Sequence, residues 1–398
     1  MSRLDVRSMV LLASAHLADD VNQSFIPALL PILIVHWHIS HATAGTLVLC
    51  QAISSSVVQP GIGHLADRRS MPWLIPLGMF LAGSGVALLG VLPTMPLLFL
   101  AALVSGIGVA AFHPEAARFA NYVSGAKKAS GMRWFTVGGN LGFAIGPAFA
   151  TVAIAAWGLA GTLAAAIPVT LMAMVSLIEL PRLSRFAPVR GKKRVSDGRD
   201  DWTSFGKLSG FVIVRSMAYL GMVAFIPLYV VEVLHGSAAV GGLTDTAFLL
   251  AGAAGTIAGG PIADRVGRKP VLIWSTGLTV IMVAVLVVLT GGGGPLPLAI
   301  GILIPTGFVL VASQASFVVL GQEYLPNRVG LASGVTLGLA VSLGGGLSPA
   351  LGAIADHFGV GATLLTVSGL ALAATLIAFT LPGETRRTTR PSDAVAPT

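Results

Sequence analysis

Long apolar stretches recur along the whole chain and restrict its fold more than any other feature. Of 398 residues, 55% are hydrophobic and only 10% are charged, whereas a soluble domain carries about 25% charged residues. The stretches are about 20 residues long, the length that a helix needs to cross a bilayer. A helix also satisfies its own backbone hydrogen bonds in lipid. We therefore predict an all-α integral protein of the cell (inner) membrane.

Twelve spans are expected, arranged as two groups of six around a polar segment. The two six-helix halves cover residues 1–180 and 205–381, joined by a basic cytoplasmic linker at 181–204 and followed by a disordered cytoplasmic tail at 382–398. The expected spans are 8–36, 42–63, 72–92, 96–119, 129–153, 158–180, 205–233, 240–262, 269–290, 295–323, 329–354 and 359–381.

Basic residues fall on one side of this arrangement. With the N-terminus inside, no Lys or Arg occurs in the outer loops 37–41, 93–95, 154–157, 234–239, 291–294 and 355–358. Cytoplasmic loops of membrane proteins are enriched in these residues, so we expect both termini in the cytoplasm. The same rule accounts for the net charge of +8, and we expect no nucleic-acid partner.

One loop motif occurs twice, half a chain apart. Gly63-x-x-x-Asp67-Arg68 follows the second span, a matching Gly-x-x-x-Asp-Arg follows the eighth, and the two aspartates are 197 residues apart. A parallel duplication of this kind is typical of transporters with two six-helix halves. Each aspartate can pair with a basic residue and hold one conformation. The predicted gating or charge-pairing residues of these loops are Asp67, Arg68, Asp264, Arg265 and Arg268.

These loops resemble motif A of the major facilitator superfamily. Gly142-x-x-x-Gly146-Pro147 in the fifth span is similar to motif C, which is typical of the drug/proton antiporters of that superfamily. The two glycines allow close helix approach and the proline bends the helix, so these three are predicted conformational residues.

A narrower resemblance covers nearly the whole chain. Five segments together resemble the fosmidomycin resistance family of efflux antiporters: 16–24, Pro72-Trp73, Phe112-His113-Pro114-Glu115, Val137-Gly138-Gly139-Asn140 and 322–330. This resemblance implies proton-coupled export of a small antimicrobial, fosmidomycin-like or another drug, by alternating access.

Polar residues in the first span form one helical stripe. His16, Asp19, Asp20 and Gln23 are spaced i, i+3, i+4 and i+7, which places them on one face. Charges at this depth need a cavity or a partner, so we expect Asp19 or Asp20 to carry a proton and His16 and Gln23 to line the substrate cavity. The alternative is that an aspartate only pairs with a basic residue of another helix.

The fourth span carries a second polar group near its cytoplasmic end. Glu115 can pair with Arg118 on the same helix or with Arg133 of the next span, either as a gate or as a static ion pair. Glu115 and His113 are also candidates for proton coupling, although a lone histidine is more often a hydrogen-bonding group between helices.

Arg215 lies about ten residues inside the seventh span, on the order of 15 Å from its end, and therefore needs a cavity or a carboxylate. We expect Asp19 or Asp20 as its partner, or an anionic substrate such as a phosphonate. The other predicted cavity residues are Phe25, Gln51, Asn140, Tyr219 and Gln314, whereas Glu232 and Asp245 are expected to be solvated near the outer surface.

No catalytic motif is evident, so we predict a transporter and not an enzyme. The Gly-rich segments 291–294 and 344–346 lack the Lys-Ser/Thr of an ATP-binding loop, and we expect no metal and no cofactor. The expected partners are a small molecule, protons and the lipid bilayer, and the protein is expected to be a monomer. Two alternatives remain open: an uptake symporter or uniporter for a sugar or organic acid, and a non-transporting membrane receptor or scaffold.

Overall fold

The computed structural model describes residues 4–68, 70–125, 128–186, 199–328, 331–332 and 334–382, and these are almost entirely helical. The helices are α1 (Val6–Trp37), α2 (His41–Arg68), α3 (Leu74–Leu88), α4 (Met95–Val123), α5 (Lys128–Trp157), η1 (Gly158–Ala165), α6 (Ala166–Ser184), α7 (Trp202–Glu232), α8 (Ala238–Val266), α9 (Arg268–Thr290), α10 (Leu296–Val311), α11 (Gln314–Tyr324), η2 (Gly334–Leu339), α13 (Ala340–Gly345) and α14 (Ser348–Phe379).

Nine helical stretches of the described residues are long and apolar enough to cross a membrane. The count differs from twelve partly because helices meet without a loop. Gly131–Ser184 forms one such stretch where two spans were expected, and Leu343–Phe379 another. Within α14, Gly359 has a φ of 81°, a conformation that glycine adopts without a steric penalty. The chain thus turns inside a continuous helical stretch, and twelve spans stay a prediction.

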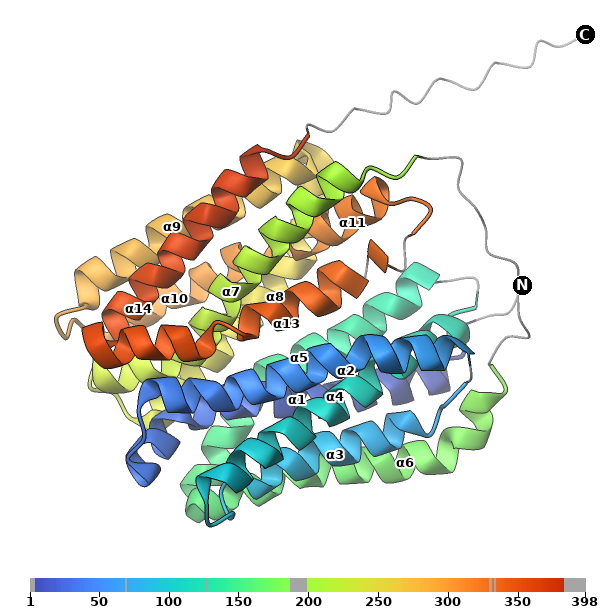
Figure 1. Cartoon of the computed structure of the whole chain (residues 1–398), viewed down its shortest axis with the longest axis horizontal. Helices are drawn as coiled ribbons and strands as arrows, with labels where there is room; N and C mark the ends of the chain where they lie inside the picture. Colours follow the sequence, from blue (N-terminus) through green and yellow to red (C-terminus); the bar gives the residue numbers. More distant parts are fainter. Residues whose placement is uncertain are drawn as a thin grey trace, which may run out of the picture.

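The helices lie in two groups. Helices α1 to α6 occupy the lower part of Figure 1 and α7 to α14 the upper part, with the groups together on the left and diverging to the right. The helix starts are anchored alike: Asp5 N donates to Val123 O (2.9 Å) and Asp201 N to Tyr324 O (2.7 Å). We call this end of the bundle, where α1 and α7 begin, the near end, and the opposite end the far end.

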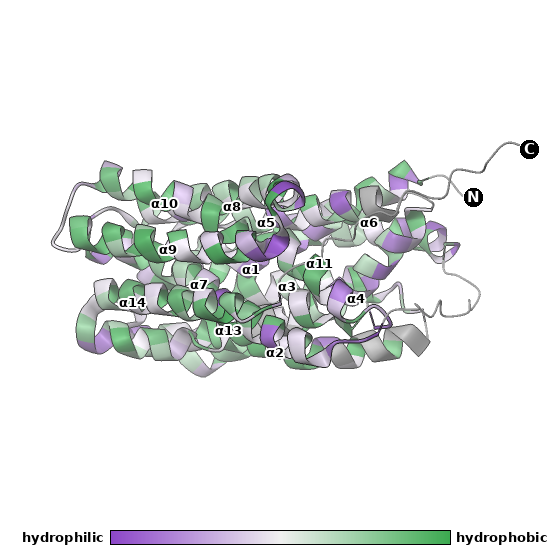
Figure 2. Ribbon diagram, turned by 90° about the horizontal axis from the view of Figure 1, so that it is seen from above, coloured by the Kyte–Doolittle hydropathy of each residue, from purple (hydrophilic) through white to green (hydrophobic). Residues whose placement is uncertain are grey.

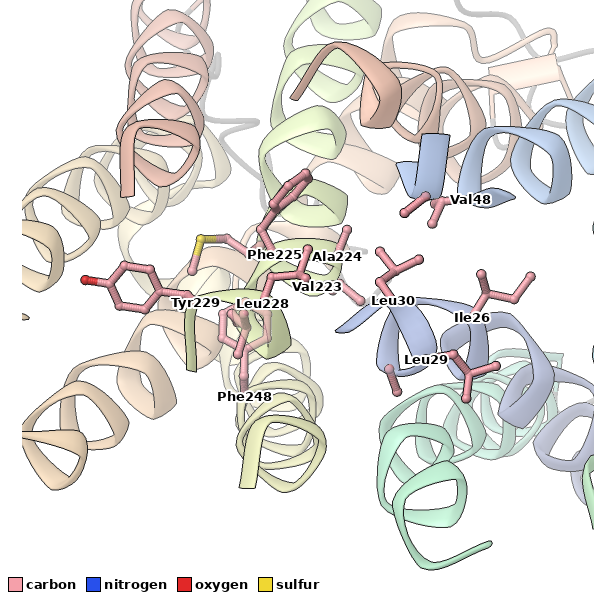
Figure 3. Close-up of a cluster of buried hydrophobic side chains, with 14 of the residues drawn as sticks. Ile26, Leu29, Leu30, Val48, Val223, Ala224, Phe225, Leu228, Tyr229 and Phe248 are labelled. Carbon is pink, nitrogen blue, oxygen red and sulfur yellow. The ribbon is translucent and has the colours of Figure 1, made fainter. Parts of the chain in front are cut away.

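The apolar cores show where the groups touch. One core contains residues of both groups, including Leu30 of α1, Val48 of α2 and Phe225 of α7, which Figure 3 shows in a single cluster with Tyr229 and Phe248. Two further cores each belong to one group, at residues 9–183 and 208–381. Burial of apolar surface therefore joins the groups toward the far end, whereas each group has its own core toward the near end.

Polar contacts reinforce the closed far end. The His41 ring links three helices: Nε2 lies 2.8 Å from Glu232 Oε1 on α7, and Nδ1 lies 2.7 Å from Asp356 Oδ1 on α14. Asp356 also accepts from the backbone N–H groups of His41 and Ala42 at 2.8 and 3.0 Å. The two groups are thus held together at this end by hydrogen bonds as well as by apolar packing.

The outer surface of the bundle is apolar, as a lipid-facing surface must be. Figure 2 shows hydrophobic residues along most of the length of the helices. Exposed side chains include Ile178 (76%) on α6, Ile257 (69%) on α8 and Val288 (80%) on α9. A soluble monomer does not expose such continuous apolar area, so this surface agrees with a protein embedded in a bilayer.

Helices α1 and α5 pack at contact distance because of glycines. A Cβ at Gly138, Gly142 or Gly146 would lie 2.2, 2.2 or 2.6 Å from the carbonyl oxygen of Ala13, Leu17 or Val21. The three glycines of α5 are spaced four residues apart, and so are the three carbonyl groups of α1. One ridge of α5 therefore fits one groove of α1. This Gly138–Gly142–Gly146 ladder gives a structural reason for the two glycines of the Gly142-x-x-x-Gly146-Pro147 motif.

Replacing Gly142 by alanine is expected to lower the thermal stability of the folded protein. The added methyl group meets the backbone of α1, which cannot yield as a side chain can, and overpacking of this kind costs roughly 1–3 kcal/mol. Gly301→Ala on α10 is the matched control, because nothing lies within 4 Å of its Cβ position. Thermal unfolding of the purified protein in detergent checks both, and equal melting temperatures would contradict the close α1–α5 packing.

Candidate functional site

A cavity of about 250 Å³ lies between the two groups of helices. Its wall combines polar side chains from both groups with three aromatic rings. The polar and aromatic residues in the lining are Asp20, Gln23, Gln51, Ser55, His113, Asn140, Phe143, Arg215, Tyr219, Thr256, Gln314, Phe317 and Thr336. The predicted cavity residues Gln23, Gln51, Asn140, Arg215, Tyr219 and Gln314 therefore all lie together at one site.

An acid–histidine cluster adjoins this cavity: Asp20, Gln23 and His113 line it, whereas His16, which was predicted to line it, contacts the cluster without belonging to the lining. His16 Nε2 lies 3.2 Å from Asp20 Oδ2, and His113 Nε2 lies 3.2 Å from Asp20 Oδ1. The two Nε2 atoms are 3.3 Å apart. Gln23 donates a hydrogen bond to the same carboxylate, and Asp19, fully buried, has Oδ2 3.6 Å from His113 Nδ1. Helix α1 thus brings its stripe of polar residues against His113 of α4.

The ring orientations in the cluster fix where protons sit. His16 Nδ1 lies 2.8 Å from the carbonyl oxygen of Phe135, and His113 Nδ1 lies 3.0 Å from that of Val109. A carbonyl oxygen only accepts, so both Nδ1 atoms carry hydrogen and both Nε2 atoms are bare when the rings are neutral. Two bare nitrogens and a carboxylate then point at one another. At least one bound cation, a proton in the simplest case, is needed to hold them there.

The same three residues meet the spacing of a metal centre, which the sequence did not lead us to expect. Their ligating atoms lie within 4.8 Å of one another, and both histidines donate their other ring nitrogen to a carbonyl oxygen, as metal-bound histidines do. No other group of this type occurs in the part of the chain that the structure describes. A shared proton and a divalent cation are thus the two candidates to occupy the cluster.

Arg215 supplies the positive charge of the cavity. It is 3% exposed and donates from Nη2 to Leu310 O at 2.8 Å, while its Nε has no hydrogen-bond partner. The guanidinium lies 5.3 Å from the Tyr219 ring centre and 5.5 Å from that of Phe317. Among the described residues no carboxylate lies within ion-pair distance of it. The expected pairing with Asp19 or Asp20 is wrong in this conformation, because two aromatic rings flank the charge instead.

Three aromatic rings stack beside the cavity, and two of them, Phe143 and Tyr219, line it. Phe143 of α5 and Tyr219 of α7 have ring centres 6.4 Å apart, and Tyr219 and Phe248 of α8 6.5 Å, with interplanar angles of 29° and 24°. These separations fit offset stacking. The aromatic stack, Phe143–Tyr219–Phe248, spans both groups, and Phe143 and Phe248 were not singled out from the sequence.

The predicted ion pairs are formed only in part. Glu115 is fully buried and accepts from Arg118 at 2.9 Å and from the backbone of Met71 at 2.8 Å. Arg133 is exposed instead of facing Glu115. Of the two expected partners of Glu115, the structure therefore shows Arg118 and not Arg133. The contact with Met71 joins α4 to the loop that precedes α3.

Of the two loops that resemble motif A, the structure describes the charged side chains of the second. Arg268 pairs with Glu323 of α11 at 2.9 and 3.0 Å, and Asp264 and Arg265 are exposed at the near end. The side chains of Asp67 and Arg68 lie outside the described residues.

Two predicted positions differ from the structure. Phe25 is fully buried and packs against Phe149 at 6.1 Å, because its face of α1 turns toward α5 and away from the cavity. Asp245 was expected to be solvated, yet its side chain is completely buried and neither oxygen has a hydrogen-bond partner. Asp245 lies inside the expected span, and its face of α8 packs against α5 and α7 instead of facing water. The sequence did contain a signal for this burial, namely an ionisable residue inside an apolar span.

Comparisons with known proteins agree with this architecture. The model of the Major Facilitator Superfamily matches residues 12–349 and 211–397. The chain is 32% identical over 360 residues to the fosmidomycin resistance protein of Escherichia coli (strain K12), covering 86% of this chain and 85% of that protein. It is 30% identical over 386 residues to the MFS-type transporter YfnC of Bacillus subtilis (strain 168), covering 94% and 93%.

Solved structures share the fold at low sequence identity. A bacterial homolog of the human lysosomal transporter Spinster, in an inward-facing and occupied conformation, has a TM-score of 0.81 at 14% identity, covering 95% of this chain and 97% of that one. The nucleoside transporter NupG has a TM-score of 0.72 at 14% identity, covering 94% and 99%. The chain therefore belongs to the major facilitator superfamily and is a multi-pass transporter of the inner membrane, not an enzyme.

Proposed function

We propose that this transporter is a proton-coupled antiporter that exports a small anionic antimicrobial from the cytoplasm. The observation that carries the proposal is the presence, in one cavity, of an acid–histidine cluster that needs a bound cation and an arginine without a carboxylate partner. A proton site and an anion site in the same cavity are what an exchange of the two requires. The relative named for fosmidomycin resistance supports export of an antimicrobial.

Arg215 selects the charge of the substrate. A guanidinium surrounded by Tyr219, Phe317 and the Leu310 carbonyl is poorly hydrated, so an anionic group that enters gains a strong charge-assisted hydrogen bond. The amides of Gln51, Asn140 and Gln314 add neutral hydrogen-bonding groups, and Phe143 and Phe317 add apolar walls. A small phosphonate fits this chemistry and a cavity of about 250 Å³.

Alternating access follows from the two groups of helices. Residues 1–180 and 205–381 act as two rigid halves that rock about the cavity, with the near end at the cytoplasm. The basic residues of the near-end loops support that orientation. The outward step carries the anion on Arg215, and the return step carries a proton on the cluster of His16, Asp20 and His113. Asp19 stays close enough to His113 to exchange that proton, and Glu115 with Arg118 steadies α4 during the movement. The cavity is built from one chain, so a monomer suffices.

Deleting the gene for this protein is expected to raise the amount of fosmidomycin that accumulates in cells, and restoring it to lower that amount. Antiport driven by the inward proton gradient moves substrate outward, so a proton uncoupler should remove the difference. Measured accumulation of the radiolabelled drug checks the direction. Lower accumulation in the deletion strain would instead favour an uptake symporter or uniporter, and no change would contradict transport of this drug.

Transport by the purified protein in liposomes is expected to be indifferent to a strong metal chelator. A proton in the acid–histidine cluster is replaced from water at once, whereas a metal ion would be removed and the activity lost. Proton-driven export in the presence and absence of the chelator checks this. Loss of transport that added Zn²⁺ restores would assign the cluster to a metal and contradict the proton site.

A further inference from the structure

The feature with no role so far is Asp245 of α8. Its side chain is completely buried, and neither carboxylate oxygen has a hydrogen-bond partner. An ionised carboxylate in such a place costs several kcal/mol, and an acid in a membrane span without a partner marks a functional site more often than not.

The surroundings of Asp245 supply no positive charge. Tyr219 of α7 is the titratable group within its electrostatic reach, and α10 contains no titratable residue. The basic residues of α9, Arg268 and Lys269, and Arg133 of α5 lie at the starts of their helices, toward the near end. Helices α1, α7 and α11 also contact α8. Asp20 of α1 and Glu323 of α11 are acids, and His16 of α1 pairs with Asp20. Arg215 of α7 donates to Leu310 O between the rings of Tyr219 and Phe317. Arg7 of α1 and Lys207 of α7 lie near the starts of their helices, at the near end, and no ion pair among the described residues includes Asp245.

Its position in α8 places Asp245 between the cavity and the closed far end. Leu249, Gly252 and Thr256 line the cavity, and Asp245 continues their stripe one turn further toward the far end. Phe248, next to it, belongs to the aromatic stack.

On its other side Asp245 adjoins the contact between the two groups of helices. One turn toward the far end, a Cβ at Gly242 would lie 2.1 Å from Thr151 Oγ1 of α5. The contact between α5 and α8 therefore separates Asp245 from the water at the far end. If the two helices moved apart, Asp245 would be exposed to that water.

We propose that Asp245 is a proton-binding residue that makes closure of the far end depend on a proton taken up from that side. Once α5 and α8 separate, the carboxyl group meets water and ionises. The two helices can close again only when this carboxyl group is neutral, because no described residue offers its charged form a hydrogen bond or a counter-ion. Closure then requires one proton from outside. The inference rests on the proposed alternating access and adds a second proton-binding position in the other half of the chain.

The test measures the far end directly and needs no substrate. Spin labels are attached at Ala155→Cys on α5 and Ala239→Cys on α8, both exposed residues beside the α5–α8 contact. The background is Cys50→Ser, which removes the single native cysteine. Distances are measured by pulsed electron paramagnetic resonance in lipid vesicles at several pH values. The protein with Asp245 is expected to shift toward the longer distance as the pH rises, and Asp245→Asn to keep the short distance at every pH.

Two results of the distance measurement would overturn the inference. One is a far end whose distance does not respond to pH in the presence of Asp245, and the other is Asp245→Asn with an unchanged pH response. Asparagine resembles the neutral acid in shape, so Asp245→Asn is expected to fold and melt as the parent protein does, and failure to fold would also contradict a neutral Asp245. Thr246→Val, next to it, should keep the full pH response. Failure of fosmidomycin export leaves these distances unaffected, so the two proposals fail separately.

Discussion

Asp20→Asn is expected to abolish export against a concentration gradient while substrate exchange between equal solutions continues. The variant keeps the shape of the side chain but removes its charge, and the asparagine N–H group can satisfy a histidine Nε2 without any added proton. The cluster then no longer needs to bind and release a cation during the cycle. Liposomes with an imposed pH gradient measure the first activity, and counterflow of labelled substrate measures the second.

The control for Asp20→Asn removes the same charge elsewhere. Asp200 lies at the near end, where it accepts from the backbone N–H of Asn327 at 3.1 Å and pairs with the exposed Arg328 at 3.4 Å. An ion pair with an exposed partner contributes little to stability, and an asparagine oxygen can still accept from Asn327. Asp200→Asn should leave both activities unchanged. Gradient-driven export that persists in Asp20→Asn, with its dependence on pH intact, would contradict coupling through this cluster and move attention to Asp19 or Glu115.

Arg215→Gln is expected to weaken binding of an anionic substrate by at least about 30-fold, since removing one member of a buried charge pair costs roughly 2–5 kcal/mol. Arg215→Lys should restore part of the affinity, because it returns the charge without the planar fork. Binding of fosmidomycin, followed by the thermal shift or by calorimetry, checks the order of the three proteins.

Lys207→Gln is the matched control on the same helix. Lys207 is exposed near the start of α7 and donates to the Thr380 carbonyl, far from the cavity, so its loss should leave affinity unchanged. If instead Arg215→Gln bound the anion as tightly as the unmodified protein, the arginine would be a structural residue held by Leu310 and the two rings. A neutral or cationic substrate would then be the better hypothesis.

Much of the fold could be predicted because the bilayer imposes simple rules. Spans of about 20 apolar residues and the absence of basic residues from alternate loops together indicate the helical class and the membrane. The breaks inside helices were harder to predict. The turn at Gly359 and the separation of α10 from α11 near Ser313 depend on local backbone conformation in segments that are apolar throughout.

The site could be predicted as a set of residues but not as a set of contacts. His16 and Asp20 meet because they are four residues apart on one helix, which the helical period alone requires. Their contact with His113, 97 residues from His16, depends on how α4 is rotated, and the sequence does not give that rotation. Arg215 shows the same limit: it is buried inside α7, as expected, while the Tyr219 and Phe317 rings lie where a carboxylate was expected.

The glycine ladder between α1 and α5 has a mechanical consequence. Three carbonyl oxygens of α1 lie against three glycines of α5, and His16 of α1 bonds to the Phe135 carbonyl of α5, so we expect the two helices to move together. His16 and Asp20 lie within the paired length of α1, and Thr151 lies further along α5, where a Cβ at Gly242 of α8 would meet its Oγ1 at 2.1 Å. Under the proposed proton coupling, a tilt of this helix pair at the acid–histidine cluster would therefore also move Thr151 at the far-end contact with α8.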